Sequence, residues 1–77
     1  MLKLPALKPR EIIKVLRKLG FDDIRQRGSH RFFYRSEDRK STLVPIHNKD
    51  IGKGLLRKIL HDIDVSPDEF MKLLKNS

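Results

Sequence analysis

The feature that most narrows the fold is a β-prone middle segment enclosed by two stretches whose apolar residues have helical spacing. In the first stretch the apolar side chains recur every three or four residues: Ile12, Ile13, Leu16 and Leu19. Pro9 suits the first turn of a helix, and Gly20 can adopt the left-handed conformation that ends many helices. The pattern predicts a first helix over residues 9–19.

The middle segment contains three β-prone runs separated by turn-forming residues. Residues 21–27 suit a short strand in an edge position, because most of their side chains are polar. Gly28 interrupts this run, and the aromatic-rich residues 31–35 form the second run. The polar residues 36–40 lead into a third run at 41–46, as in an antiparallel hairpin. We therefore expect a three-stranded antiparallel meander.

Helical spacing returns in the second half of the chain, at Leu55, Leu56, Ile59, Leu60 and Ile63. It predicts a second helix over residues 52–62. Ser66, Pro67 and Glu69 then form a start signal for a short C-terminal helix. We expect an α+β fold in the order α-β-β-β-α plus this last helix, with the helices packed on one face of the sheet and the other face open to solvent. A single domain would span residues 1–77.

The composition of the 77-residue chain favours an open basic surface over a large enclosed pocket. Lys and Arg number 18 against 10 Asp and Glu, which gives a formal net charge of +8. Such a surface attracts nucleic acid, an anionic membrane or an acidic protein, although a solvated basic surface without a special partner is the alternative. The lack of cysteine excludes disulfides, thiolate chemistry and Cys-ligated zinc. No signal peptide or membrane span is recognisable, so we expect a cytoplasmic protein.

The motif that most suggests chemistry is Gly28-Ser29-His30, which has arginines on both sides and an aromatic run behind it. Histidine is the side chain best suited to proton transfer near neutral pH, and nearby arginines attract a polyanion. The motif therefore suggests acid–base chemistry on a nucleic-acid backbone. On residues alone, a surface histidine at the start of a strand is the alternative.

The aromatic run Phe32-Phe33-Tyr34 has two interpretations. Successive side chains of a strand point to opposite faces, so Phe33 points away from Phe32 and Tyr34. At least one of the three rings therefore belongs to the core. We expect the run to serve mainly the core, with stacking on nucleic-acid bases as the alternative.

The order and spacing of several motifs make the chain, from Lys8 to Leu74, similar to the HicA-type toxin family, the small mRNA interferases of HicA–HicB toxin–antitoxin pairs. These motifs are Leu19-Gly20-Phe21, Gly28-Ser29-His30 with the aromatic strand after it, Val44-Pro45-Ile46-His47 and Leu55-Leu56-Arg57-Lys58-Ile59-Leu60. The resemblance implies a double-stranded-RNA-binding-domain-like fold and metal-independent mRNA cleavage that inhibits growth, with His30 as the catalytic histidine. It also implies a cognate HicB-type antitoxin, with a toxin that is monomeric when free and part of a larger hetero-oligomer when bound. The loop of residues 48–54 is less typical of the family, so no role is transferred to a single loop residue.

The three histidines differ in what they could do. RNA can be cleaved when its 2′-hydroxyl attacks the adjacent phosphorus, which needs a base, an acid and positive charge on the phosphate. His30 could act as base or acid, Gly28 would let the substrate backbone approach closely, and Ser29 could orient the ring or contact a phosphate. His47 is either a second proton carrier or substrate contact, or a loop histidine that stabilises a turn. His61 is expected to be structural.

Basic residues are the expected phosphate contacts, with a solvated basic face as the alternative for each of them. They are Arg25, Arg27, Arg31, Lys49, Lys53, Arg57 and Lys58. The last three lie near the start of the second predicted helix, where free N–H groups also favour anions. No histidine pair has the i, i+4 spacing of a common zinc site, so we expect no metal and no other cofactor. Two other functions stay open: a non-catalytic RNA-binding module, and a protein whose basic face docks an acidic partner.

Overall fold

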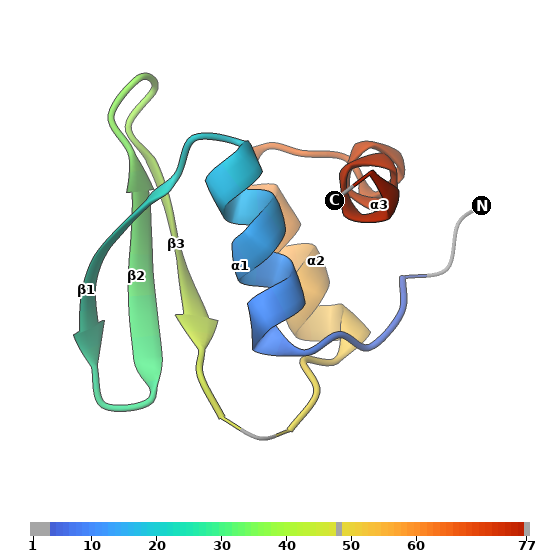
Figure 1. Cartoon of the computed structure of the whole chain (residues 1–77), viewed down its shortest axis with the longest axis horizontal. Helices are drawn as coiled ribbons and strands as arrows, with labels where there is room; N and C mark the ends of the chain where they lie inside the picture. Colours follow the sequence, from blue (N-terminus) through green and yellow to red (C-terminus); the bar gives the residue numbers. More distant parts are fainter. Residues whose placement is uncertain (1–3, 48, 77) are drawn as a thin grey trace.

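The computed structural model describes residues 4–47 and 49–76. In chain order its elements are α1 (Pro9–Lys18), β1 (Asp22–Arg27), β2 (His30–Arg35), β3 (Lys40–Pro45), α2 (Lys53–Ile63) and α3 (Pro67–Lys75), drawn in Figure 1. The strands form one antiparallel sheet in the order β1-β2-β3. This is the predicted α+β arrangement, similar to a double-stranded-RNA-binding domain, and the first five elements lie within one residue of their predicted bounds.

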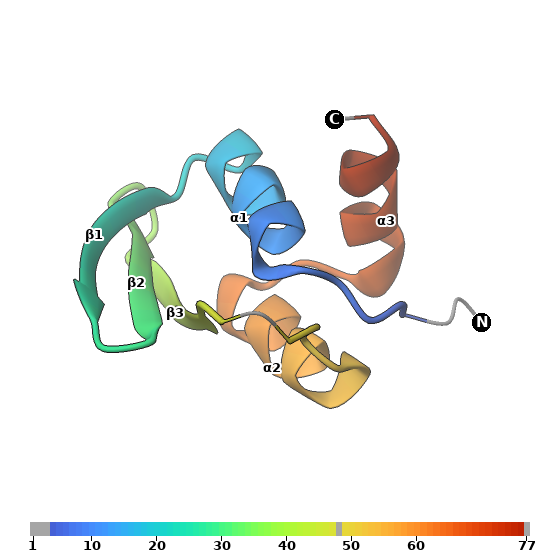
Figure 2. The ribbon, with the colours of Figure 1, turned by 60° about the horizontal axis from the view of Figure 1, so that its bottom comes forward.

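The helices form a layer on one side of the sheet. Helices α1 and α2 pack against β3, and α3 packs against these two helices rather than against the sheet (Figure 2). Strand β1 is the edge strand farthest from the helices, and all six of its residues are exposed. In the described part of the chain no helix lies on the opposite face of the sheet, as the sequence predicted (Figure 2). None of the helices within the described residues is long and apolar enough to cross a membrane.

Local signals explain where α1 begins and ends. The Glu11 carboxylate accepts a hydrogen bond from the Lys8 backbone N–H at 3.0 Å, which satisfies a donor that the helix leaves open. At the other end Gly20 has a φ of +89°, and the Phe21 N–H donates to the Leu16 carbonyl at 3.0 Å. The left-handed glycine and this bond form the C-terminal cap that the sequence predicted.

The later helices also begin and end at recognisable caps. Helix α2 ends at Asp64, whose φ of 58° is left-handed although the residue is not glycine. Helix α3 begins at Ser66, whose hydroxyl accepts a hydrogen bond from the Glu69 N–H at 3.1 Å. The Lys18 ammonium group donates to the Asn76 carbonyl at 2.8 Å, so the end of α1 is tied to the end of α3.

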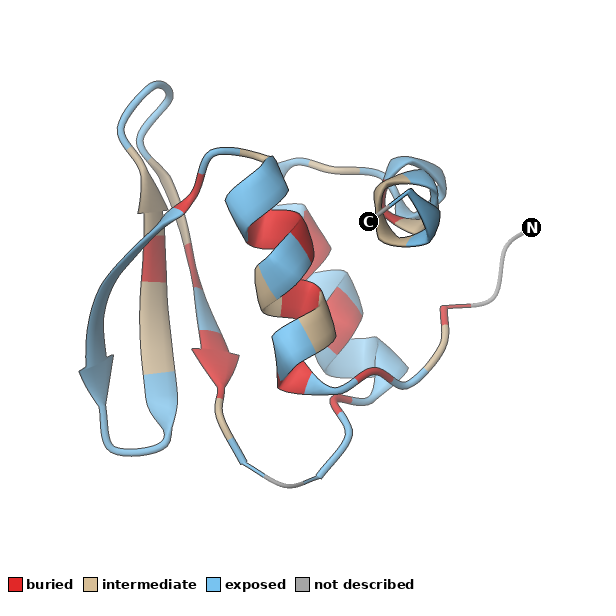
Figure 3. Ribbon diagram, viewed as in Figure 1, coloured by how far each residue is buried: buried red, intermediate tan, exposed pale blue. Residues whose placement is uncertain are grey.

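The core lies between the sheet and the helices, and Figure 3 shows buried residues on α1, α2, β2 and β3 while β1 is exposed along its whole length. Phe33 points into this core and is 0 % exposed. Phe32 and Tyr34 are only half-buried and point to the other face. The expectation that the aromatic run is mainly core is therefore confirmed for Phe33 and wrong for its two neighbours. A polar link also joins the layers, because the Thr42 hydroxyl donates to Asp62 on α2 at 2.9 Å.

Candidate active site on the open face of the sheet

The Gly28-Ser29-His30 motif forms the tight turn between β1 and β2. Arg27 pairs with His30, so Gly28 and Ser29 alone make the hairpin loop. Gly28 has a φ of +58° at the first central position, as in a type II′ turn, and this conformation favours glycine. His30 is consequently the first residue of β2 and is exposed.

The strand register brings distant residues together on the open face. Phe32 lies between Arg25 of β1 and Leu43 of β3, which are its cross-strand partners. Two residues earlier on β2, His30 lies between its own cross-strand partners, Arg27 of β1 and Pro45 of β3. Cross-strand partners point to the same face, and that face is the one opposite Phe33. A histidine, two cations and two apolar side chains thus share one surface.

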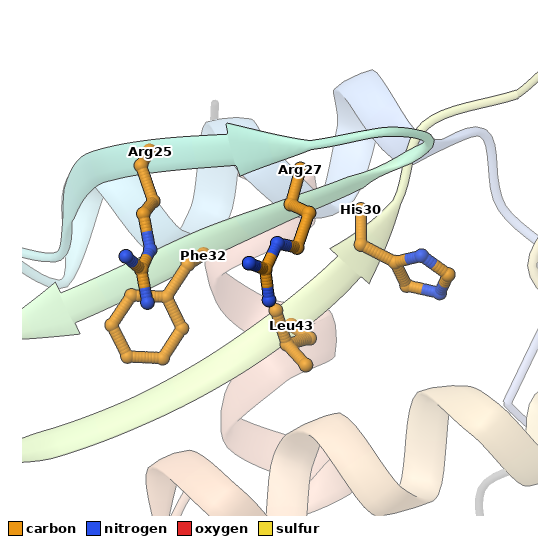
Figure 4. Close-up of a pocket in the computed structure, with 5 residues that line it drawn as sticks. All are labelled: Arg25, Arg27, His30, Phe32 and Leu43. Atoms are coloured by element: carbon orange, nitrogen blue, oxygen red, sulfur yellow. The ribbon is translucent and has the colours of Figure 1, made fainter.

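These side chains line a shallow hollow of about 550 Å³. The lining residues are Arg25, Arg27, His30, Phe32 and Leu43. Figure 4 shows the two arginine side chains extending along the sheet surface from β1, while the His30 ring points away from Phe32 at one end of the group. Leu43 is 50 % exposed. The hollow therefore combines an apolar floor with a cationic edge.

The turn that carries His30 is held from two sides. The Ser29 carbonyl accepts a hydrogen bond from the Ile46 N–H, which attaches the turn to the end of β3. The Gln26 side-chain amide donates to the Gly28 carbonyl at 3.1 Å, and its oxygen accepts a bond from the Arg31 guanidinium at 3.0 Å. The backbone next to His30 is therefore fixed without using the imidazole.

Arg31 does not belong to the His30 surface, although the sequence grouped the two. As the neighbour of His30 in a strand, it points to the helix-covered face. There its guanidinium lies 3.4 Å from the Asp23 carboxylate and also binds Gln26. Strand alternation separates the two residues, so Arg31 supports the hairpin and does not line the hollow.

His47 also lies apart from His30. It lines a second hollow of about 300 Å³ beside the start of α1, together with Lys8, Pro9, Arg10 and Ile46. The Nδ1 atom of His47 accepts a hydrogen bond from the Lys49 N–H at 3.2 Å. This contact is the one expected of a loop histidine that stabilises a turn, which was one of the two predictions for His47. The structure therefore does not bring two histidines into one hollow.

The comparison with known families decides the classification. The sequence model of a family described as the HicA toxin of bacterial toxin-antitoxin matches residues 9–65, from the first residue of α1 to the residue before the cap of α3. The chain belongs to the HicA toxin family. A comparison with curated proteins gives no match. Membership makes the protein a toxin of a toxin–antitoxin system, which implies a cognate antitoxin as its partner.

The remaining basic residues of this HicA toxin lie outside the His30 hollow. Lys49 and Lys53 are exposed, the first in the loop and the second at the start of α2. Arg57 and Lys58, which were expected to contact phosphate, are exposed on α2. His61, which was expected to be structural, is exposed on the same helix. Lys58 is paired with Asp62 at 3.2 Å. Among the described residues, no group of three or more His, Asp or Glu side chains is arranged to hold a metal ion.

Sequence reasoning missed two parts of the HicA hollow. Leu43 was assigned only to a strand, and Phe32 mainly to the core. Both belong to the hollow because the Gly28-Ser29 turn sets the register of β1 on β2, and the pairing of β2 with β3 extends it. Strand alternation predicts that Phe32 and His30 share a face. Which residues of β1 and β3 lie beside them is determined by the register, which the sequence does not show.

Proposed function

We propose that this HicA toxin is a metal-independent endoribonuclease that cleaves mRNA in the cytoplasm and thereby inhibits translation and growth. His30 would transfer the proton, and a HicB-type antitoxin would neutralise the toxin. The observation that carries the proposal is an exposed histidine in one hollow with two arginines, in a chain of this family. Free toxin would be a monomer, and the antitoxin would bring it into a larger hetero-oligomer.

The chemistry requires only groups that RNA and the hollow supply. The 2′-oxygen attacks the adjacent phosphorus and loses its proton to a base, while the bond to the 5′-oxygen breaks and that oxygen gains a proton. The products are a 2′,3′-cyclic phosphate and a free 5′-hydroxyl. His30 could exchange either proton, because an imidazole accepts a proton when neutral and donates one when protonated. Arg25 and Arg27 would stabilise the charge that develops on the phosphate.

A non-catalytic RNA-binding module is the second candidate. It is favoured by one observation: among the described residues, His30 is the only histidine that lines the hollow. A complete acid–base pair would then need water, the substrate or a residue that moves on binding. A binding module needs no second proton carrier, and the net charge of +8 suits it equally well.

Expression without antitoxin separates these two functions. We expect the wild type to arrest growth and to reduce full-length mRNA, and His30→Ala to restore both. His61→Ala is the matched control, because His61 is an exposed histidine on α2 outside the hollow. It should behave like the wild type. A folded wild type that is harmless contradicts the toxin function, and a His30→Ala variant that remains toxic contradicts the role of His30.

Purified protein tests the chemistry directly. Cleavage of an RNA strand should persist in EDTA and should leave a 2′,3′-cyclic phosphate at the new end. Loss of cleavage in EDTA contradicts metal independence. If wild type and His30→Ala bind RNA equally and neither cleaves it, the binding module is the correct function.

A further inference from the structure

The floor of the hollow is apolar on a face that no helix covers. Phe32 is half-buried there, and its cross-strand partner Leu43 is 50 % exposed. Neither side chain is needed against the helices, because the core face of the same strands is filled by Phe33, Thr42 and Val44. Exposed apolar groups that gather in a concave site are typical of a binding surface.

The edge of the hollow is cationic. Arg25 and Arg27 border the floor from β1, and no carboxylate of the described residues lines it. Within the described residues neither arginine forms an ion pair, in contrast to Arg31 on the other face. An anionic ligand with a flat apolar part would fit both the floor and the edge. A nucleotide has this composition, since its phosphate is anionic and its base has an apolar face.

The apolar floor also distinguishes between single-stranded and double-stranded RNA. In a duplex the faces of the bases are stacked on one another, so the groove presents phosphates, hydroxyls and base edges. These groups would leave Phe32 and Leu43 without an apolar partner. An unpaired base can turn its face outward and cover them, as in other single-strand binders.

We propose that Phe32 and Leu43 seat one unpaired base while Arg25 and Arg27 hold the neighbouring phosphate, so that this toxin takes single-stranded RNA. Phe32 is then a specificity residue that selects unpaired nucleotides and presents the adjoining linkage to His30. The inference rests on the proposed function only in taking RNA as the ligand, and it does not require that His30 cleaves.

Binding in a His30→Ala background tests the floor separately from cleavage. The probes are a fluorescently labelled RNA oligonucleotide and the same strand annealed to its complement. We expect Phe32→Ala to weaken single-strand binding about tenfold or more, since that is the scale of one lost base stack. Phe32→Tyr should retain binding. Tyr34→Ala is the matched control, because Tyr34 is half-buried on the same face of β2 but outside the hollow.

A tryptophan reporter makes the contact visible. The chain contains no tryptophan, so Phe32→Trp introduces a single indole in the floor. Single-stranded RNA should quench its fluorescence by stacking, whereas the duplex should quench it much less. Tyr34→Trp should respond weakly to both. The same fluorescence, with circular dichroism, verifies that each variant is folded.

The outcomes separate this inference from the proposed function. If single strands quench the Phe32→Trp reporter but the wild type never cleaves RNA, the base-binding role of the floor is supported and the nuclease function is contradicted. If the wild type cleaves RNA but Phe32→Ala does not weaken the binding of single-stranded RNA, the base-binding role of the floor is wrong and the nuclease function stands. Equal binding of duplex and single strand also contradicts the inference. Quenching by the purified antitoxin but by no RNA contradicts it too, and would show that the floor docks a protein.

Discussion

The arginines of the β1–β2 hairpin differ according to the face on which they lie. On the helix-covered face, Arg31 binds Asp23 and Gln26, and Arg35 binds the Asp38 carboxylate with two nitrogens at 3.0 and 2.7 Å. On the open face, Arg25 and Arg27 form no ion pair among the described residues and border the hollow. The difference shows which cations stabilise the fold and which are available to a ligand.

Arg35 illustrates how fully a cation on the helix-covered face is used. Besides binding Asp38, its guanidinium donates to the Leu19 carbonyl at 2.7 Å and lies 4.5 Å from the centre of the Phe21 ring. It therefore connects β2 to the end of α1, and its side chain is only 17 % exposed. Such a residue cannot reach a ligand on the other face without giving up these contacts.

The largest expected effect is the difference in stability lost when the phenylalanine of each face is replaced by alanine. Phe33→Ala should lower the free energy of unfolding by about 3–5 kcal/mol, because it leaves a cavity in the core. Phe32→Ala should lower it by about 1 kcal/mol or less, since it removes mainly a cross-strand contact. Urea titration followed by circular dichroism measures both values. Equal losses would show that the open face supports the fold as much as the core face does.

The second prediction compares charge removal on the two faces. The double variant Arg25→Ala/Arg27→Ala should weaken RNA binding and reduce the slope of log K against log salt by about 0.7, the value for one lost phosphate contact with a single strand. Arg31→Ala/Arg35→Ala removes the same charge and should change this slope much less while destabilising the fold. Fluorescence anisotropy at several salt concentrations measures the slope. An equal change in both variants would mean that net charge, not position, governs binding.

Much of the fold could be predicted from the sequence because its signals are local. Gly20 and Ser66 mark helix ends by capping chemistry that involves only a few neighbouring residues. Gly28 likewise marks the hairpin turn, because its left-handed φ is a property of one residue. Each of these signals is complete within one turn of chain, so the elements could be bounded closely without knowing what packs against them.

The composition of the site could not be predicted in the same way because it depends on strand pairing. The register of β1 shifts between Asp23 and Arg25, where Ile24 is an extra residue that is 52 % exposed. Simple alternation would place Asp23, Arg25 and Arg27 on one face. The bulge instead leaves Asp23 on the helix-covered face, next to Arg31, and the two arginines on the open face.

The third prediction concerns a single arginine from each face. Arg35→Ala should lower the free energy of unfolding by about 1–2 kcal/mol, because it removes charged hydrogen bonds from a mostly covered side chain. Arg25→Ala should change it by no more than about 0.5 kcal/mol, as is usual for an exposed residue without such contacts. Thermal unfolding of the two variants provides the comparison. A larger loss for Arg25→Ala would mean that β1 is held by contacts on the open face.

The smallest expected effect is the acid sensitivity that Arg35 confers through Asp38. The guanidinium hydrogen bond lowers the pKa of the Asp38 carboxyl below its ordinary value of 3.8. A carboxyl whose pKa is lower in the folded state binds its proton more readily in the unfolded chain, so its stabilisation is fully present above the unfolded pKa and is lost as the pH falls through the folded one. Asp38→Asn should therefore reduce the loss of stability on acidification below about pH 4, by a small amount because the pair is partly exposed to solvent. Urea midpoints of both proteins from pH 6 downward measure this, and identical pH dependence would show that the Arg35–Asp38 pair is too well solvated to couple protonation to folding. In that case the role of Arg35 on the helix-covered face would rest on its hydrogen bond to the Leu19 carbonyl and on its contact with the Phe21 ring, since neither depends on pH in this range.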